Sequence, residues 1–224
     1  MVEAAGIRKS YSRGKKVLKE ISFYARPGEC VGIVGENGCG KTTLLSILAG
    51  TLKADGGSLK YFGEEVLGDR KAICRQVAYV PQENPLMEEL SVRDNLLLWY
   101  QGRRAAMKRD LQNGPAFTLG LSGHERETAG KLSGGMKKRL SIACSLAGHG
   151  RILIMDEPGA ALDLLCKEEI RRYLEAYRKG GGIVILTSHD LMELQMCSRI
   201  YIMKDGRLTE LEKDFPLEQL AGRL

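Results

Sequence analysis

The sequence predicts an α/β protein with a mostly parallel sheet, an N-terminal antiparallel β region and an inserted α-helical subdomain. Short apolar runs, mostly of β-branched residues, alternate with helical stretches, as in a layered α/β core. Each run ends in polar or glycine-rich residues, which is typical of parallel strands that helices cover on both faces. These runs are Cys30–Val34, Val77–Val80, Ile152–Met155 and Ile183–Thr187. Helical patterns replace them between Gln82 and Leu132, which indicates a helical insertion.

The other predicted elements are two N-terminal strand segments, two helices and a C-terminal hairpin. The first helix is stopped by Gly50, and a capping box from Ser91 to Asp94 precedes the second. The hairpin is indicated by the turn residues Lys204 to Gly206 between its strands. In chain order the elements are Val17–Leu18, Ile21–Tyr24, Thr42–Ala49, Asn95–Tyr100, Arg199–Met203 and Arg207–Leu211.

Composition places the chain among soluble globular proteins, with 224 residues, 43% hydrophobic and 28% charged. No apolar run approaches the roughly 18 residues that a membrane-spanning helix needs, and the start MVEAAGIRKSY lacks the apolar stretch of a signal peptide. We therefore expect a cytoplasmic protein unless a partner holds it at a membrane. The formal charge of +6 permits nucleic acid, anionic lipid or nucleotide as partners, but surplus surface lysine also explains it, so the charge alone decides nothing. No nucleic acid partner is expected.

The sequence GENGCGKTT, Gly35 to Thr43, matches the phosphate-loop pattern G-x-x-x-x-G-K-[ST]. It follows a predicted strand and opens a predicted helix, although a plain glycine-rich turn is the alternative. Backbone N–H groups of such a loop point at the β-phosphate of a nucleotide. Lys41 adds a positive charge near the β- and γ-phosphates, and the Thr42 hydroxyl suits Mg²⁺. The candidate nucleotide contacts are Gly35, Asn37, Gly38, Cys39, Gly40, Lys41, Thr42 and Thr43.

Cys39 places a thiol among these inward-facing amides. The amides and Lys41 are expected to lower its pKa and make it reactive, and the alternative is that the position only demands a small side chain. The six cysteines contain no C-x-x-C pair and no histidine at ligand spacing, so neither disulfides nor a zinc site is expected.

Two carboxylates directly follow an apolar strand in ILIMDEP, Ile152 to Pro158. A buried strand that ends in Asp156 brings a charge to the sheet edge where open α/β folds bind ligands, so we expect Asp156 to bind Mg²⁺ through water. Glu157 is then free to polarise an attacking water as general base. A strand-end turn closed by Pro158 is the alternative.

Gln82 and His189 also follow strands, in YVPQE and ILTSHD. Gln82 offers an uncharged oxygen to Mg²⁺ or water, although a lone glutamine there means little. His189 ends a strand similar to the one before Asp156, which favours a γ-phosphate contact over a surface or core histidine. His124 and His149 have no such setting and receive no role.

The stretch LSGGMKKRLSIACSLA, Leu132 to Ala147, has the makings of a second anion-binding helix start. Ser133 can cap the helix, while Gly134 and Gly135 leave backbone N–H groups bare. A γ-phosphate on its own phosphate loop is exposed on one side, and a second helix N-terminus can close that side.

Together these motifs resemble the ATP-binding-cassette (ABC) ATPases, the nucleotide-binding subunits of ABC transporters. The match covers nearly the whole chain and rests on GENGCGKTT, Gln82, LSGGM, ILIMDEP, AALD at 160–163 and His189, of which LSGG is the most specific. The resemblance implies one ABC ATPase domain over residues 1–224, with a P-loop NTPase core at about 1–82 and 146–224 and a helical subdomain at about 83–145. It also implies ATP and Mg²⁺ as cofactors and hydrolysis coupled to transport.

In this family two subunits pack head to tail, so the resemblance implies a second copy or a homologous ATPase subunit as a partner. Ser133 and Gly135 would then contact the ATP that the other subunit holds. Tyr11 matches the aromatic residue that stacks on adenine, although a solvent-facing tyrosine at a strand end is the alternative. Val17 would touch the base, and Asp163 matches the aspartate that connects the two sites. The candidate catalytic residues are Lys41, Gln82, Glu157 and His189, and the candidate metal ligands are Thr42, Gln82 and Asp156.

Three positions depart from the family pattern. Met136 replaces the usual glutamine after LSGG, Gly159 a common threonine, and Leu164 a frequent proline. Methionine at position 136 resembles exporter-type members, and the other two replacements are expected to loosen the loop after Glu157. None removes a group needed for hydrolysis, so we expect an active ATPase.

The resemblance also implies separate transmembrane permease subunits, which would hold the protein at the inner face of the cell membrane. We expect them to dock at Glu83 to Leu90, a loop with the apolar residues Pro85, Leu86 and Met87. The compact helical lobe, LSGGMKKR and the bare C-terminus favour export over import. A soluble ABC ATPase such as an iron–sulfur assembly factor is the alternative. A small-molecule P-loop kinase is a third function class, but it should lack LSGG.

Overall fold

The computed structural model describes residues 1–11, 14, 16–148, 150–160, 162–212 and 215–222. His149 and residue Ala161 of the AALD motif lie outside the described residues. Within the described ranges, no helix combines the length and the apolar composition that crossing a membrane requires.

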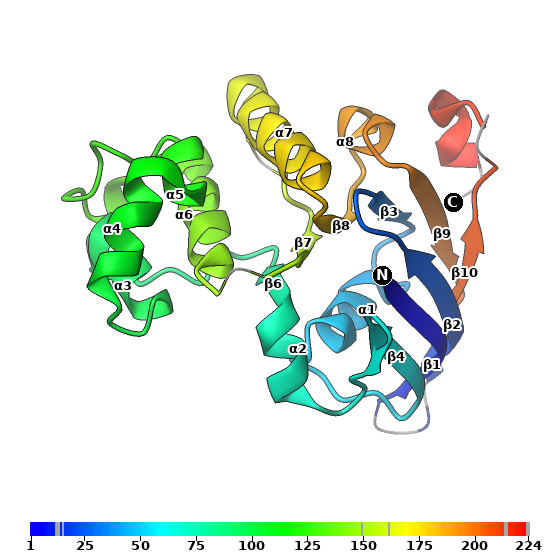
Figure 1. The fold of residues 1–224 in the computed structure, drawn as a ribbon. Coiled ribbons are helices and arrows are strands. Elements are labelled where there is room, and N and C mark those ends of the chain that lie inside the picture. The colour runs from blue at the N-terminus through cyan, green and yellow to red at the C-terminus, as the bar shows by residue number, and fades with distance from the viewer. Residues whose placement is uncertain (12–13, 15, 149, 161, 213–214, 223–224) are drawn as a thin grey trace.

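A six-stranded sheet runs through the core in the order β10-β9-β3-β8-β7-β6 (Figure 1). All pairs among β3, β6, β7, β8 and β9 are parallel, and β10 is antiparallel to β9. The strands are β3 (Cys30–Val34), β6 (Val77–Val80), β7 (Ile152–Asp156), β8 (Ile183–Thr187), β9 (Arg199–Lys204) and β10 (Arg207–Glu210). The predicted bounds of β3, β6 and β8 and the predicted hairpin are confirmed, and β7 extends one residue further than predicted.

The central strands are apolar because both of their faces are covered. Every residue of β3, β7 and β8 is buried. Along β7, Ile152 and Ile154 belong to one hydrophobic cluster, and Leu153 and Met155 belong to a second cluster on the opposite face. The alternation follows from the two-residue period of a strand, so burial on both faces demands a continuous apolar run.

A second, antiparallel sheet has the order β2-β1-β4-β5. The two predicted N-terminal segments are parts of one strand, β2, which pairs with β1. The other three strands and helix α2 were not predicted from the sequence, because their apolar residues are few and are interrupted by glycine or charge. The elements are β1 (Val2–Ser10), β2 (Lys16–Ala25), β4 (Gly56–Tyr61), β5 (Glu64–Glu65) and α2 (Arg70–Gln76).

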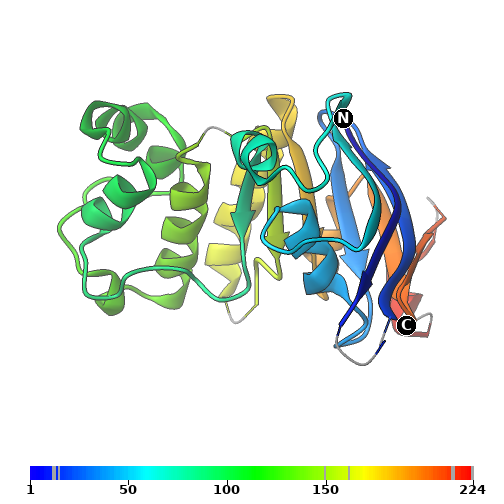
Figure 2. The same cartoon turned by 90° about the horizontal axis from the view of Figure 1, so that it is seen from below.

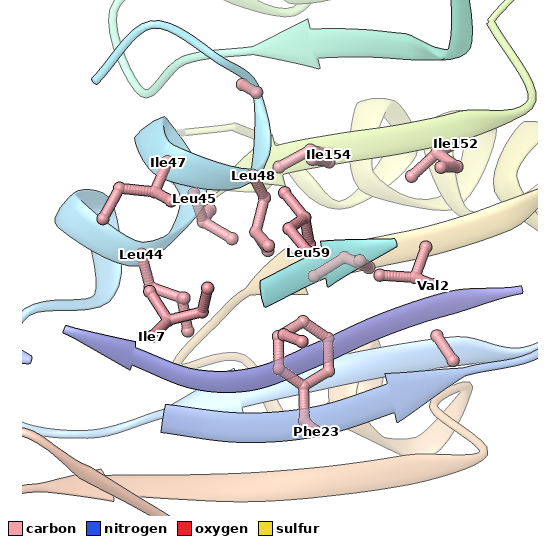
Figure 3. Close-up of a cluster of buried hydrophobic side chains, with 14 of the residues drawn as sticks. Val2, Ile7, Phe23, Leu44, Leu45, Ile47, Leu48, Leu59, Ile152 and Ile154 are labelled. Carbon is pink, nitrogen blue, oxygen red and sulfur yellow. The ribbon is translucent and has the colours of Figure 1, made fainter. Parts of the chain in front are cut away.

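Helix α1 (Lys41–Leu48) lies between the two sheets and begins and ends one residue earlier than predicted. Its apolar residues are buried around most of its circumference, since both sheets pack against it. Figure 3 shows side chains of α1 meeting residues of β7 on one side and of β1, β2 and β4 on the other. The labelled residues are Val2, Ile7, Phe23, Leu44, Leu45, Ile47, Leu48, Leu59, Ile152 and Ile154.

The helices of the predicted insertion lie together on one side of the sheets, as both views show (Figures 1 and 2). Ser91 caps the first of them by accepting a hydrogen bond from the Asp94 N–H at 3.1 Å. The cap is therefore as predicted, but the helix begins at Val92 and not at Asn95. These helices are α3 (Val92–Trp99), α4 (Arg104–Asn113), α5 (Pro115–Thr118) and α6 (Gly134–Leu146), while α7 (Leu164–Lys179) and α8 (Leu191–Gln195) cover the sheet.

Helix α6 is joined to the core by polar contacts. The Lys138 ammonium donates to the carbonyl oxygens of Pro81 and Gln82, each at 3.2 Å, and the Ser145 hydroxyl donates to the Tyr79 carbonyl at 2.8 Å. Lys138 is only 3% exposed, and burial lowers the pKa of its ammonium although Asp156 opposes this. These contacts attach α6 to the end of β6.

The start of α6 also packs tightly against α7, and this contact generates the first prediction. A Cβ atom added at Gly135 would lie 2.0 Å from Cys166 Sγ and 3.0 Å from Cys166 Cβ, whereas a Cβ at Gly134 would meet nothing within 4 Å. We expect Gly135→Ala to lower the free energy of unfolding by about 1–3 kcal/mol because of overpacking.

Gly134→Ala is the matched control and is expected to leave stability unchanged or raise it by up to about 1 kcal/mol, since alanine favours the helix. Urea denaturation followed by circular dichroism measures both values. Equal destabilisation by the two substitutions would contradict the packing described here.

Candidate active site

The polar residues that follow the parallel strands meet at one edge of the sheet. The phosphate loop follows β3, Gln82 follows β6, Glu157 follows β7 and His189 follows β8. A cavity of about 460 Å³ lies at this edge. It is lined by Tyr11, Val17, Asn37, Gly38, Gly40, Lys41, Thr42, Thr43, Gln82 and Glu157. The structure thus brings most of the predicted nucleotide contacts to one place.

The backbone of the phosphate loop favours glycine at three of its predicted positions, of which Gly38 has a φ of 80°. Gly40 adopts a left-handed conformation with φ of 117° at the start of α1. A Cβ at Gly35 would lie 2.3 Å from the Met203 carbonyl oxygen. Lys41 is 6% exposed, and its ammonium donates to the carbonyl oxygens of Gly35 at 2.6 Å and Glu36 at 3.1 Å. Its third N–H remains available to a phosphate oxygen.

Tyr11 and Val17 border the same cavity on the side of the antiparallel sheet. The Tyr11 side chain is 46% exposed, and its hydroxyl forms a hydrogen bond with Thr43 Oγ1 at 3.3 Å. This bond ties the ring to the start of α1 and leaves ring surface open to a base. Val17 is half-buried beside Gly40.

Cys39 corrects one prediction. Burial raises the pKa of the Cys39 thiol, and the opposing effect of the Lys41 charge and of the backbone amides does not overcome it. The prediction of a lowered pKa was therefore wrong, because the thiol is half-buried and Lys41 directs its ammonium to carbonyl oxygens. A thiol with a raised pKa is a poor nucleophile at neutral pH.

Two predicted catalytic side chains flank the Glu157 carboxylate. Gln82 Nε2 donates to Glu157 Oε2 at 3.2 Å, and His189 Nε2 lies 3.7 Å from Glu157 Oε1. Glu157 itself has a φ of 47°, a left-handed conformation that is unusual for a residue with a side chain. The turn after β7 therefore holds the carboxylate toward the cavity, between the residues that end β6 and β8.

Asp156 is 2% exposed and has one carboxylate oxygen satisfied by the protein. Its Oδ1 accepts a hydrogen bond from Thr187 Oγ1 at 2.6 Å, whereas Oδ2 is buried and has no hydrogen-bond partner among the described residues. A free, buried carboxylate oxygen fits a water held by Mg²⁺. Thr42 and Gln82 supply further oxygen atoms at the cavity.

A cluster of three or more histidine, cysteine, aspartate or glutamate side chains suited to a metal ion does not occur in the described part of the chain. Mg²⁺ prefers oxygen ligands and keeps several waters, so one or two protein groups plus nucleotide oxygens suffice to hold it. Asp156, Thr42 and Gln82 therefore fit this ion when a nucleotide supplies the remaining ligands.

Two residues of the site were not singled out from the sequence. Thr187 binds both Asp156 and Glu157, and Lys138 binds the Gln82 carbonyl. Thr187 gave no signal because threonine is common in strands. Lys138 did give a signal in the sequence, because it has a helical spacing to Ser141 and Ser145, and all three are buried. Polar residues along one buried face of a helix need hydrogen-bond partners.

The second predicted anion site lies apart from the cavity in the structure. Ser133 caps α6 by accepting from the Met136 N–H at 3.2 Å, and Asp163 caps α7 by accepting from the Cys166 N–H at 2.9 Å. The latter bond lowers the pKa of the exposed Asp163 carboxyl. Neither residue lines the 460 Å³ cavity, and neither does Gly135. Their contact with a nucleotide of another subunit stays a prediction.

The glycine at position 159 has a specific neighbour. A Cβ there would lie 2.2 Å from Oε1 of Glu193, a buried residue that accepts a hydrogen bond from the Ser188 hydroxyl at 2.5 Å. Burial raises the pKa of the Glu193 carboxyl. Gly159 therefore makes room for a buried acid. Leu164, the other departure, is the first residue of α7 and is 76% exposed.

Comparison with known proteins identifies the family. Residues 18–160 match the family model described as ABC transporter, which is more than half of the chain. The chain belongs to the ABC transporter family. It is a nucleotide-binding ABC ATPase, as the motifs predicted.

Curated relatives of this ABC ATPase include subunits of both transport directions. It is 34% identical over 209 residues to the Nod factor export ATP-binding protein I of Paraburkholderia xenovorans, covering 92% of the chain and 68% of the relative. It is 35% identical over 202 residues to the aliphatic sulfonates import ATP-binding protein SsuB of Cupriavidus necator, covering 89% of the chain and 65% of the relative. The chain thus spans about two thirds of the length of these relatives.

Among solved structures, this ABC ATPase resembles the dimeric post-hydrolysis state of the ATP-binding cassette MJ0796 bound to ADP and Pi. The TM-score is 0.82 at 24% identity, and the match covers 96% of this chain and 100% of that chain. The likeness confirms the predicted P-loop NTPase fold.

The raised pKa of Cys39 generates the second prediction. We expect iodoacetamide to modify Cys39 about tenfold or more slowly than the exposed Cys74 near neutral pH, because little thiolate forms below a raised pKa. The difference should narrow as the pH rises through the pKa of Cys39. Mass spectrometry of the two cysteine-containing peptides measures both rates, and faster modification of Cys39 at neutral pH would contradict the expectation.

Proposed function

We propose that this ABC ATPase is the ATP-hydrolysing subunit of a transporter, that it dimerises around ATP, and that it drives transport through separate membrane subunits. One observation carries the proposal: the Glu157 carboxylate reaches the phosphate-loop cavity with Gln82 at one oxygen and His189 near the other. In this arrangement Glu157 is the general base, and Gln82 is both the polar group that orients water and a ligand for the cation.

We assign ATP binding to groups that line the cavity. Loop amides that open α1 and the third N–H of Lys41 bind the phosphates, with the partial positive charge of the helix start adding to the attraction. The Tyr11 ring stacks on the base, and Val17 contacts its edge. Mg²⁺, held by Thr42, Gln82 and water on Asp156, would neutralise charge on the phosphate oxygens.

Hydrolysis requires a water that is aligned with the γ-phosphorus. The Glu157 carboxylate accepts a proton from this water, and the Gln82 amide orients it from the adjacent strand end. His189 donates a hydrogen bond to a γ-phosphate oxygen as negative charge develops. Since the two partners approach different oxygens of Glu157, the carboxylate keeps one defined orientation.

Dimerisation would complete the site, because Ser133 and Gly135 lie at the start of α6 and do not line the cavity of their own chain. A second copy or a homologous subunit would place its Ser133 hydroxyl and the N–H groups at the start of α6 against the γ-phosphate. Asp163, at the start of α7, would contact the opposite site. The dimeric form of MJ0796 supports this arrangement.

The segment Glu83 to Leu90 is a loop whose backbone is fixed at Met87 while the Met87 side chain is exposed. Asn95 is 2% exposed and holds the Met87 backbone by accepting from its N–H and donating to its carbonyl, both at 2.9 Å. The Met87 side chain is nevertheless 55% exposed. An exposed apolar side chain on a fixed backbone is suited to a partner surface, so we assign the contact with the membrane subunits to this segment. The protein would then lie peripherally on the cytoplasmic face of the cell membrane.

Export is the direction that we propose. The sequence LSGGMKKR, with methionine at position 136, supports it, as does the Nod factor export relative, although one relative is an import subunit. The transported compound is selected by the membrane subunits.

The third prediction concerns Glu157, and its substitution tests the proposed function directly. We expect Glu157→Gln to leave ATP affinity within about twofold and to lower kcat by about 100-fold or more, since the amide cannot accept the proton. Unhydrolysed ATP should then hold dimers together, so the 24.7 kDa protein should elute as a dimer on a sizing column with ATP and Mg²⁺. Turnover close to that of the wild type, or a protein that stays monomeric at saturating ATP, would refute the proposal.

The docking segment generates the fourth prediction. Reversing charge at Glu89, or at Glu88, should uncouple ATPase activity from transport and lower recovery of the protein with its membrane subunits, while ATP affinity stays unchanged. Glu88 is paired with Lys137 at 2.7 Å, so Glu89→Lys is the cleaner variant. Glu64→Lys, on the exposed edge strand β5, is the matched control and should have no effect. Equal coupling in the Glu89→Lys variant and the control would exclude this docking surface.

A further inference from the structure

Strand register places Thr187 beside both acidic residues of the site. The parallel pairing of β7 with β8 makes Asp156 and Thr187 direct partners at the last position of the ladder. Thr187 is completely buried, so its hydroxyl must find its hydrogen bonds within the protein. Both of these bonds go to the pair Asp156 and Glu157.

The first bond orients the Asp156 carboxylate. Thr187 Oγ1 donates to Asp156 Oδ1 at 2.6 Å, a length typical of a hydroxyl bound to an ionised carboxylate. With Oδ1 fixed, the remaining oxygen Oδ2 is confined to one position, where the described residues offer it no partner. The bond therefore determines which oxygen is left for a divalent cation and its water.

The second bond holds the Glu157 backbone. The Glu157 N–H donates to Thr187 Oγ1 at 3.0 Å, in the same residue whose φ is 47°. A left-handed conformation is unfavourable for a residue with a side chain, so it persists only where neighbouring contacts fix it. Satisfying this N–H stabilises the turn that aims the Glu157 side chain at Gln82.

One hydroxyl serves as donor to a carboxylate and as acceptor from an amide at the same time. Serine and threonine meet both requirements in so small a space, and valine, which has the shape of threonine, meets neither. Threonine also has a stiff χ1 and a strong preference for strands, which keeps the hydroxyl in place at the end of β8.

We propose that Thr187 is a positioning residue that orients the cation-binding oxygen of Asp156 and the carboxylate of Glu157 through a single hydroxyl. The proposal rests on the ATPase function given above and adds a residue that acts through both acids. Its specific consequence is that cation affinity and turnover depend on the hydroxyl, while the binding of nucleotide without metal does not.

The test compares Thr187→Val with Thr187→Ser and uses Ser188→Ala as a matched control. Ser188 is a neighbouring buried hydroxyl that binds Glu193 and neither Asp156 nor Glu157. The probe is Mn²⁺, titrated into each variant with ADP and measured by the EPR signal of the free ion. ADP affinity without metal, kcat for ATP and the unfolding temperature complete the set.

We expect Thr187→Val to weaken Mn²⁺ binding about tenfold or more and to lower kcat at least as much, since a hydrogen bond to a charged group is lost. Thr187→Ser should restore both within about threefold. Ser188→Ala should keep the Mn²⁺ affinity of the wild type, and all variants should bind metal-free ADP equally. If Thr187→Val does not fold, Thr187→Ala removes the same hydroxyl and carries the same expectation.

Wild-type Mn²⁺ affinity and turnover in the variants without the hydroxyl would overturn the proposal. Equal losses in Thr187→Val and Thr187→Ser would also overturn it, because the retained serine hydroxyl would then fail to restore cation binding and turnover. An equal loss in Ser188→Ala would overturn it as well, because the effect would not be specific to the hydroxyl that binds Asp156 and Glu157. If the wild type itself shows no ATP turnover and no cation binding with ADP, the proposed ATPase function fails, which is a result distinct from these.

Discussion

The parallel pairing of β3, β8, β7 and β6 is the constraint on which the rest of the site depends. Because parallel strands end at the same edge, every residue that directly follows one of them is brought to the same line. The phosphate loop, Gln82, Asp156 with Glu157, and His189 are distant in sequence and adjacent only for this reason. A shift of one residue in the β7–β8 register would turn Asp156 to the other face of the sheet and separate it from Thr187.

Buried charges at this edge are tolerated because each has a polar partner from the backbone or from a hydroxyl. Lys41 and Lys138 both donate to carbonyl oxygens, and Asp156 accepts from a hydroxyl. An unpaired ammonium or carboxylate in such an environment would be strongly unfavourable, so these bonds restrict the conformations open to the loop and to α6. The site is therefore positioned by polar contacts that reach the ends of the strands, and the apolar clusters on either side of the sheet support the strands themselves.

Much of the fold was predictable from the sequence where a strand is a continuous apolar run, whether wholly buried as in β3 and β8 or fully buried only at alternate residues as in β6. The runs at β3, β6 and β8 are continuous and apolar, so their bounds were predicted correctly, and the phosphate loop is marked by its glycines. Strands such as β1 and β4 were missed because one face is partly exposed and glycine interrupts the pattern. The burial of the Cys39 thiol and the bonds of Thr187 arise from packing between segments far apart in sequence, and no local pattern contains them. Lys138 is intermediate, since its spacing to Ser141 and Ser145 was visible, but no local pattern showed that it faces the end of β6.

The attachment of α6 to the end of β6 connects the start of this helix with the Glu157 carboxylate. Ser133 caps the start of α6, and Lys138 lies five residues further along the same helix. The Lys138 ammonium donates to the Gln82 carbonyl, and the Gln82 side chain donates to Glu157. Thermodynamic reciprocity then applies: if a ligand at the helix start shifts the free energy of the Gln82 conformations, occupancy near Gln82 shifts affinity at the helix start by the same factor. In a dimer of two such chains, nucleotide bound in one subunit would therefore change the affinity of the other site through Lys138, which contacts the Gln82 carbonyl.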